Sequence, residues 1–391
     1  MADNNENKVL NVPHLRFPEF SGEWNKYTIN DLATVVGGGT PDTTVKSYWG
    51  GDIQWFTPSE IGKNKYVDFS KRTITRDGLD NSSAKLLPLH TILLSSRATV
   101  GECSIASNEC TTNQGFQSLI AKQCNIDFLY YLIQTKKKDL IRNACGSTFL
   151  EISANEIRKI KVAVPVQNEQ EQIAKLLSLI DERIATQNKI IEDLKKLKCA
   201  IIEKLYSKIQ GKEYSYGQLF DVVNERNKQM EYYNILSASQ EKGMVNRDDL
   251  NLDIQFERSN INTYKIVRKG DYVIHLRSFQ GGFAFSDKLG VCSPAYTILR
   301  PNSLLEYSYL SYYFTSQRFI KSLIIVTYGI RDGRSINVEE WLNMKVVIPS
   351  KEHQLHTLNV LKRIDDKVEN EEKYATCLSN QKQYLLRQMF I

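Results

Sequence analysis

The sequence has no long apolar run, no apolar leader and no paired cysteines. No stretch approaches the roughly 18 apolar residues of a membrane-spanning helix, and the polar N-terminal MADNNENKVLNVP lacks the apolar core of a signal peptide. The seven cysteines are scattered and form no CxxC pair. These absences predict reduced thiols in a cytoplasmic protein and argue against a zinc site.

Catalytic motifs are also missing. The nine prolines include no adjacent pair, which excludes the Asn/Asp-Pro-Pro-aromatic motif of DNA amino-methyltransferases. GxxxxGK(S/T), HExxH and GxSxG are absent too, and we interpret His353 and His356 as solvated residues at the start of a helix. We therefore predict no catalytic residue, no metal and no cofactor on this chain, although a scattered nuclease triad stays open at this point.

The composition indicates a folded chain of two or three domains. Hydrophobic residues make up 41% of the 391 residues and aromatic residues 10%, which is ordinary for globular proteins. The net charge of +6 comes from 51 basic and 45 acidic residues. This small excess is compatible with nucleic-acid binding but does not require it.

Residues 166–210 form the most regular stretch of the sequence. Steps of four and three residues lead through Ile173, Leu177, Ile180, Ile184, Gln187, Ile191, Leu194, Lys198, Ile201 and Leu205, of which eight are apolar. This spacing is typical of a coiled-coil seam. Because such a helix would be roughly 65 Å long, we predict that a partner helix covers it.

The partner helix lies in the same chain. A shift of 184 residues places MKVVIP (344–349) on IKVAVP (160–165), and the second seam then runs from Thr357 to Met389. Both seams have a polar fifth position (Gln187, Glu371) and a lysine at the eighth (Lys198, Lys382). We predict an internal duplication and an antiparallel intramolecular coiled coil, with register fixed by Lys198 facing Glu371 and Gln187 facing Lys382.

The remaining segments read as two copies of one α+β domain. Short strands, short helices and polar loops alternate in both, and VRKGDYVIHLR (267–277) lies on LPLHTILLSSR (87–97) at a shift of 180. The expected organisation is a flexible lead (1–20), a first domain (21–165), a long helix (166–210), a second domain (211–349) and a second long helix (350–391). The loops differ between the copies, as expected of two different recognition surfaces.

Side chains suited to DNA occur in these loops. Arginine can contact guanine, and asparagine or glutamine can contact adenine, through paired hydrogen bonds in the major groove. In the first copy the predicted DNA-binding residues are Thr40, Arg97, Asn113 and Gln114, with Lys63 and Lys65 for phosphates. In the second copy they are Arg277, Ser278, Gln280, Tyr328, Arg331 and Arg334. Arg97 and Arg277 carry most weight, because the duplicated strands deliver both to equivalent positions.

The chain resembles the specificity subunit of bacterial type I restriction-modification systems over essentially its whole length. The segments that carry the resemblance are RFPEFSGEW (16–24), GGTP to YWGGDIQW (38–55), LLSSRATVG (93–101), NQGF (113–116), KVAVPVQNEQEQIAKLLSLID (161–181) and KVVIPSKEHQ (345–354). The second domain departs more, since it lacks a GGTP loop and has SPAY where the first copy has NQGF.

The resemblance implies a non-catalytic DNA-binding subunit of a host-defence restriction system. Each target recognition domain would read one half of a bipartite, asymmetric double-stranded DNA site, and the helices would serve as spacer and docking post. Two methyltransferase subunits and two restriction subunits would be the partners. Adenine methylation with S-adenosylmethionine and DNA cleavage with ATP and Mg²⁺ would belong to them. Two alternatives stay open, a self-contained nuclease or methyltransferase and a coiled-coil adaptor that binds only proteins.

Overall fold

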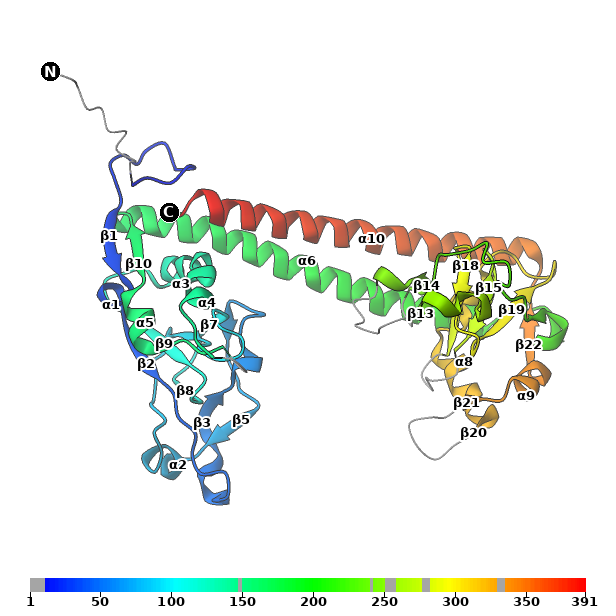
Figure 1. Cartoon of the computed structure of the whole chain (residues 1–391), viewed down its shortest axis with the longest axis horizontal. Helices are drawn as coiled ribbons and strands as arrows, with labels where there is room; N and C mark the ends of the chain where they lie inside the picture. The colour runs from blue at the N-terminus through cyan, green and yellow to red at the C-terminus, as the bar shows by residue number, and fades with distance from the viewer. Residues whose placement is uncertain (1–10, 147–149, 240–241, 250–257, 276–281, 329–334) are drawn as a thin grey trace. The chain divides into compact units, whose positions relative to one another are not determined.

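The computed structural model describes residues 11–146, 150–239, 242–249, 258–275, 282–328 and 335–391. Two compact units make up the chain: unit 1 combines residues 1–188 with 373–391, and unit 2 is residues 189–372. Each unit holds one α+β globular part and a segment of each long helix, α6 (Gln167–Ser207) and α10 (Lys351–Gln388) (Figure 1). The two helices therefore lie within the ranges predicted for them, and their ends belong to the cores of the units.

Unit 1 contains mixed sheets and short helices. Its two-stranded sheet pairs β1 (Asn25–Thr28) with β10 (Lys161–Val164). A second sheet has the order β2 (Ala33–Gly37), β9 (Gln117–Ala121), β6 (Ile92–Leu94), β7 (Cys103–Ala106) and β4 (Tyr66–Val67). A third has the order β5 (Arg72–Ile74), β3 (Trp49–Phe56) and β8 (Cys110–Thr112). The helices are α1 (Ile29–Leu32), α2 (Arg76–Asp80), α3 (Ile126–Thr135), α4 (Lys137–Arg142) and α5 (Ala154–Lys159).

Unit 2 repeats much of this plan. β11 (Lys212–Ser215) pairs with β22 (Lys345–Ile348), and a four-stranded sheet has the order β12 (Phe220–Val223), β19 (Thr297–Pro301), β16 (Tyr272–Ile274) and β17 (Phe283–Phe285). Two-stranded sheets join β13 (Leu236–Ser239) to β14 (Gly243–Asn246), β15 (Lys265–Val267) to β18 (Gly290–Cys292), and β20 (Thr327–Tyr328) to β21 (Ser335–Ile336). The helices are α7 (Tyr309–Tyr313), α8 (Gln317–Ser322) and α9 (Val338–Asn343).

The strand orders confirm the α+β class and the internal duplication. The order β2-β9-β6-β7 in unit 1 recurs as β12-β19-β16-β17 in unit 2. Trp55 pairs in parallel with Thr111, and at the predicted shift of 180 Ile235 pairs in parallel with Val291. Two segments of unrelated sequence would not be expected to preserve pairing partners in this way.

The apolar seam is present on both long helices. Between positions 185 and 200 of α6, only Gln187, Ile191, Leu194 and Lys198 are buried or half-buried. All ten predicted seam positions from Thr357 to Met389, the last just after the end of α10, are likewise buried or half-buried. The antiparallel pairing of α6 and α10 within each unit buries these side chains. Among the described residues, no helix is long and apolar enough to cross a membrane.

A tyrosine, an aspartate and a lysine join the two helices within unit 1. The Lys382 ammonium of α10 lies 2.6 Å from Asp181 Oδ1 of α6. The Tyr131 hydroxyl of α3 donates to Asp181 Oδ2 at 2.7 Å, and the ammonium lies 5.4 Å from the centre of the Tyr131 ring. This unit 1 triad therefore fixes the helix pair against the globular part through α3.

Unit 2 contains the equivalent triad with the helices exchanged. Lys198 of α6 forms an ion pair with Asp365 of α10. The Tyr312 hydroxyl of α7 donates to Asp365 Oδ2 at 2.7 Å, and the lysine lies 5.2 Å from the centre of that ring. The duplication thus extends from the backbone to a half-buried polar network.

The two triads correct the predicted helix register. Lys198 was predicted to face Glu371, and Lys382 to face Gln187. In both cases the carboxylate that the lysine contacts lies six residues before the predicted partner, and Glu371 forms an ion pair with Lys367 of its own helix. The seam pattern alone does not fix how far one antiparallel helix is shifted along the other, and the aspartates that the lysines contact also accept hydrogen bonds from Tyr131 of α3 and Tyr312 of α7.

The predicted lead of residues 1–20 divides into two parts. Residues 1–10 lie outside the described residues. Arg16, by contrast, forms two hydrogen bonds of 2.7 Å with the buried carboxylate of Glu169 in α6, and Leu15 N donates to Gln388 O of α10. A buried charge pair and a backbone hydrogen bond thus attach residues 15 and 16 to the long helices, and the flexibility of the lead as a whole stays a prediction.

Candidate nucleic-acid interface

The glycine-rich loop after β2 is a point of close backbone approach. A Cβ atom on Gly38 would lie 2.0 Å from Asn113 O, and one on Gly39 would lie 2.3 Å from Ala84 N. Gly39 N donates to Thr112 O at 2.8 Å, while its carbonyl accepts from the Trp55 indole at 2.9 Å. Only glycine fits these two positions without backbone movement, so the GGGTP motif places Thr40 firmly against the β8–β9 loop.

The turn after β6 presents Arg97. Ala98 has a φ of 62°, a left-handed conformation that is unfavourable for a residue with a Cβ atom. Ser95 Oγ donates to Arg97 O at 3.1 Å and lies 2.9 Å from Thr99 Oγ1, and Ala98 N donates to Leu150 O at 3.0 Å. A strained turn that neighbours hold this firmly is typical of a functional position.

Arg97, Asn113 and Gln114 line one small cavity. With Pro58, Ala98 and Gly115 they enclose about 270 Å³ that is open to solvent. Thr40 donates a hydrogen bond to the side chain of Gln114. The fold therefore gathers four predicted DNA-binding residues from three separate loops into one surface, which we name the reading cluster.

The electrostatics of the reading cluster leave Arg97 available for a ligand. Its Nε lies 3.8 Å from Glu151 Oε2, and the two side chains are 47% and 53% exposed. An ion pair this long and this exposed contributes little, about 0–1 kcal/mol. A guanine edge or a phosphate could replace the carboxylate at small cost.

An arginine that the sequence reading missed lies beside the reading cluster. The exposed guanidinium of Arg72 lies over the ring of Trp49, 3.6 Å from its centre, and 5.4 Å from the centre of Trp55. The two indoles meet edge to face at 5.0 Å. The tryptophans of YWGGDIQW were visible in the sequence, but the partner was not, because the β3–β5 register brings Arg72 to them.

Lys63 and Lys65 do not lie with the reading cluster. Both line a different crevice of unit 1, between the Gly62–Tyr66 loop and the two long helices. Lys65 is 10% exposed, and its ammonium lies 2.6 Å from both Asp127 Oδ1 and Ser178 Oγ. This ion pair and its burial disfavour the predicted phosphate contact of Lys65. Burial and the hydrogen bond to Asp127 also raise the pKa of Tyr66 in the same crevice.

The predicted residues of the second copy fall mostly outside the described residues. Arg277, Ser278, Gln280, Arg331 and Arg334 belong to this group, and Tyr328 is the last residue of β20. His275, which occupies the position of Ser95, precedes the first of these segments, and burial lowers its pKa.

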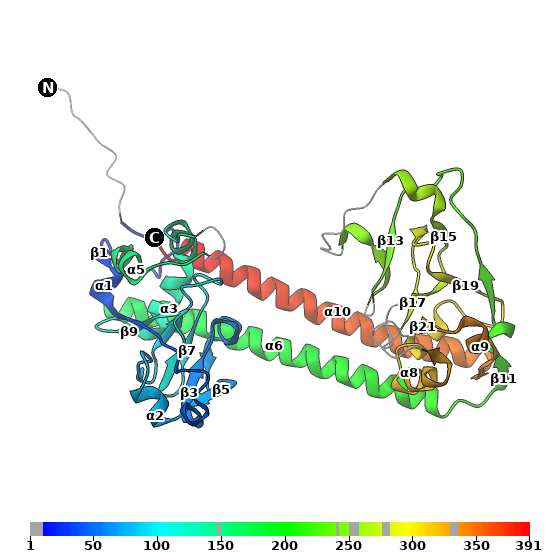
Figure 2. The ribbon, with the colours of Figure 1, turned by 60° about the horizontal axis from the view of Figure 1, so that its bottom comes forward.

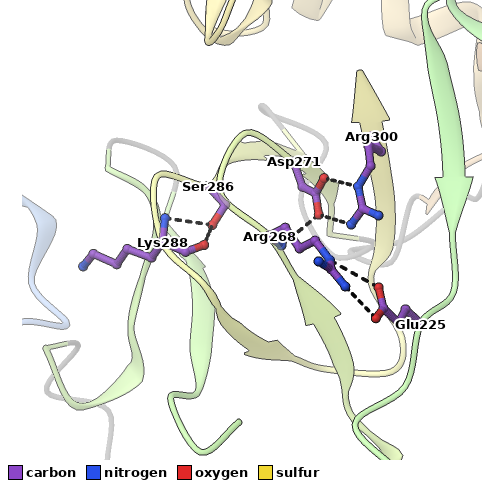
Figure 3. Close-up of polar contacts among 6 residues, drawn as sticks. All are labelled: Glu225, Arg268, Asp271, Ser286, Lys288 and Arg300. Carbon is purple, nitrogen blue, oxygen red and sulfur yellow. Dashed lines mark hydrogen bonds and ion pairs between the residues drawn. The ribbon is translucent and has the colours of Figure 1, made fainter. Parts of the chain in front are cut away.

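A polar network joins strands and turns of the four-stranded sheet of unit 2. The buried carboxylate of Asp271 accepts two hydrogen bonds of 2.9 Å from Arg300 and one of 2.8 Å from Arg268 N (Figure 3). The Arg268 side chain pairs with Glu225 at 2.8 Å. Because both arginine side chains are bound to carboxylates, they stabilise the sheet and are not available to DNA in this structure.

The described residues offer no metal centre. No group of three or more His, Cys, Asp or Glu side chains among them is arranged to hold a metal ion. The arrangement in unit 1 instead offers hydrogen-bond donors and acceptors of the kinds that read base edges.

Comparison with known proteins identifies relatives of the chain. A family model described as type I restriction modification DNA specificity domain matches residues 21–196. The MjaIX type I restriction enzyme specificity subunit of Methanocaldococcus jannaschii is 35% identical over 210 residues, which are 51% of this chain and 48% of that protein. The chain spans about half the length of the relatives it matches in this way.

Solved structures share the fold over nearly the whole chain. A type I restriction-modification S subunit from M. genitalium has a TM-score of 0.53 at 17% identity and covers 97% of this chain and 99% of its own. A chain from a structure on complex assembly of the type I restriction-modification system has a TM-score of 0.62 at 14% identity, with 96% and 98% covered. The comparisons thus confirm the resemblance to type I specificity subunits and the α+β fold with two long helices.

Proposed function

We propose that the chain, whose residues 21–196 match a family model described as type I restriction modification DNA specificity domain, is a specificity subunit that recognises a bipartite, asymmetric DNA target. Each α+β unit reads one half of the target. The observation that carries the proposal is the reading cluster, in which Arg97, Asn113, Gln114 and Thr40 converge on one exposed surface of unit 1.

The chemistry of these side chains suits direct readout of DNA. Arginine donates a pair of hydrogen bonds to guanine O6 and N7, and asparagine or glutamine both donates to and accepts from adenine. The glycines at 38 and 39 and the strained turn at Ala98 hold the loops in place before DNA arrives. Such preorganisation lowers the entropic cost of binding.

The chain directs methyltransferase and restriction subunits rather than reacting with DNA itself. Methylation with S-adenosylmethionine and cleavage with ATP and Mg²⁺ belong to those partners, which act in the cytoplasm. Exposed apolar side chains on the long helices support a docking role, with Leu179, Tyr374 and Tyr384 in unit 1 and Ile190 and Leu197 in unit 2. Apolar side chains that stay exposed after folding are available to a partner, although singly scattered ones are normal on a protein surface.

Removal of the gene from its host tests the proposal. Long-read sequencing of DNA methylation should show one bipartite motif that disappears with the gene and returns with the intact copy. Persistence of every methylated motif would contradict the proposal.

Assays on the purified chain separate the alternatives. Cleavage or methyl transfer by the chain alone would favour a self-contained enzyme. A complex that holds partner subunits but shows no salt-dependent DNA binding would favour a coiled-coil adaptor.

A further inference from the structure

The stack of Arg72 on Trp49 points to a base contact outside the predicted set. We propose that Arg72 is a specificity-determining residue whose guanidinium donates two hydrogen bonds to the major-groove edge of a guanine in the half-site read by unit 1. The inference rests on the proposed function, because it assigns a role at the same DNA-binding surface.

Strand pairing fixes the position of Arg72. On β5 it lies directly opposite Trp55 of β3 in an antiparallel pair, and β3 is irregular between Trp49 and Ile53. Trp49 therefore comes close enough for the guanidinium to lie 3.6 Å from its ring centre. β3, β5 and α2 lie on the side of unit 1 away from the long helices (Figures 1 and 2), where the helix pair leaves the strands uncovered.

The donor groups of Arg72 remain free in the described part of the chain. Its guanidinium makes no ion pair and no hydrogen bond to any described residue, whereas Arg16, Arg76 and Arg300 each pair with a carboxylate. Stacking on an indole immobilises the planar group through its face and leaves the N–H groups at its edge for a ligand. Arg72 is thus oriented without being neutralised.

The stack is continuous with the reading cluster. The Trp49 indole donates to Asp42 O at 3.1 Å, and the Trp55 indole donates to Gly39 O at 2.9 Å. Both acceptors flank Thr40, which donates to Gln114 of the reading cluster. The loop of residues 39–42 therefore connects the reading cluster to the stack of Arg72 on Trp49, so we expect DNA bound at the cluster to reach Arg72.

The second copy replaces the aromatic platform. At the shift of 180 residues, Gln229 occupies the position of Trp49 and Ile235 that of Trp55. The parallel pairing of Trp55 with Thr111 recurs as that of Ile235 with Val291, whereas residues 227–234, at the positions of the first part of β3, form no strand. A feature that one copy has and the other lacks, on a shared framework, is what two different half-sites require.

Substitution of Arg72 in the full chain tests the assignment. Arg72→Ala and Arg72→Lys should both weaken discrimination at one base pair of one half-site by about 5- to 150-fold, and the methylated motif should become degenerate at that position only. Trp49→Leu should produce a smaller defect at the same base, since it removes the platform but leaves the arginine. Arg76→Ala is the matched control, because Arg76 is exposed, lies on α2 and pairs with Asp80.

The readouts are the methylation motif in cells and the salt dependence of binding by the purified complex to a duplex that carries the motif. Variants are compared with the parent by thermal melting to exclude unfolding. A uniform loss of affinity with a shallower salt slope and an unchanged motif would assign Arg72 to a phosphate and overturn the base contact. Behaviour identical to Arg76→Ala would also overturn it. Because the parent gene must still restore the motif, either result would leave the proposed function intact.

Discussion

Replacement of Lys382 by methionine should destabilise unit 1 by about 2–3 kcal/mol. The substitution keeps the apolar stem that packs in the seam and removes the ammonium from the unit 1 triad. Asp181 then keeps the hydrogen bond from the Tyr131 hydroxyl but loses the ion pair with Lys382. A carboxylate left without its counter-charge in a half-buried site is the main source of the expected loss.

The magnitude follows from distance and burial. Two charges 2.6 Å apart attract by about 6 kcal/mol at an effective dielectric constant of about 20, and desolvation of both groups offsets most of this gain. Lys382 and Asp181 are 15% and 19% exposed. Their pair therefore falls between exposed pairs, worth about 0–1 kcal/mol, and fully buried pairs, whose disruption costs about 3–5 kcal/mol.

The second triad supplies an internal comparison. Lys198 and Asp365 are 28% and 37% exposed, so water screens them more strongly than the first pair. Lys198→Met should accordingly cost unit 2 only about 1 kcal/mol. The order of the two effects depends on burial alone, since the chemistry is the same in both triads.

Hydrogen exchange measured by mass spectrometry is the suitable assay, because it reports opening free energies separately for α3 and α7. Double-mutant cycles should show coupling of Lys382 with Asp181 and of Lys198 with Asp365, tested with the aspartates changed to asparagine. A cycle of Lys198→Met with Glu371→Gln is the control. Coupling of Lys198 to Glu371 rather than to Asp365 would refute this argument and restore the register expected from the seam.

Three further outcomes are expected. Arg97→Ala should relax or abolish recognition of the half-site read by unit 1, with discrimination lowered by about 1–3 kcal/mol, and an unchanged methylation motif would exclude the assignment. His90→Gly should stabilise unit 1 by about 0.5–1 kcal/mol in chemical denaturation, because His90 has a φ of 66° where the second copy has Gly270 at 96°, and a loss of stability would contradict the strain argument. Burial raises the pKa of Tyr131 and Tyr312 above the ordinary value of about 10 for tyrosine. The contribution of each hydroxyl to stability is therefore complete below about pH 10 and declines as the pH rises further. Tyr131→Phe and Tyr312→Phe should flatten this alkaline decline in stability, and unchanged curves of stability against pH would count against it.

Much of the architecture could be predicted from residue spacing. The seam positions and the duplication depend on local patterns, such as a heptad period and repeated strands. A local pattern fixes which face of an element is buried and where a strand ends. Those facts were sufficient to name Arg97, Asn113 and Gln114 as candidates and to indicate the family, whereas their convergence on one surface came from the fold.

Contacts between distant segments were beyond the reach of such patterns. A heptad seam allows several positions of one antiparallel helix along the other, and the partner of Lys198 is Asp365, which also accepts a hydrogen bond from Tyr312 of α7. The sequence indicates that Lys65 is an exposed loop lysine, whereas in the structure Asp127 and Ser178 of α6 contact its ammonium. The Arg72 stack joins two strands separated by a loop. In each case the interaction energy depends on the distance between two side chains. The spacing of residues along the chain does not determine that distance, and the three-dimensional packing does.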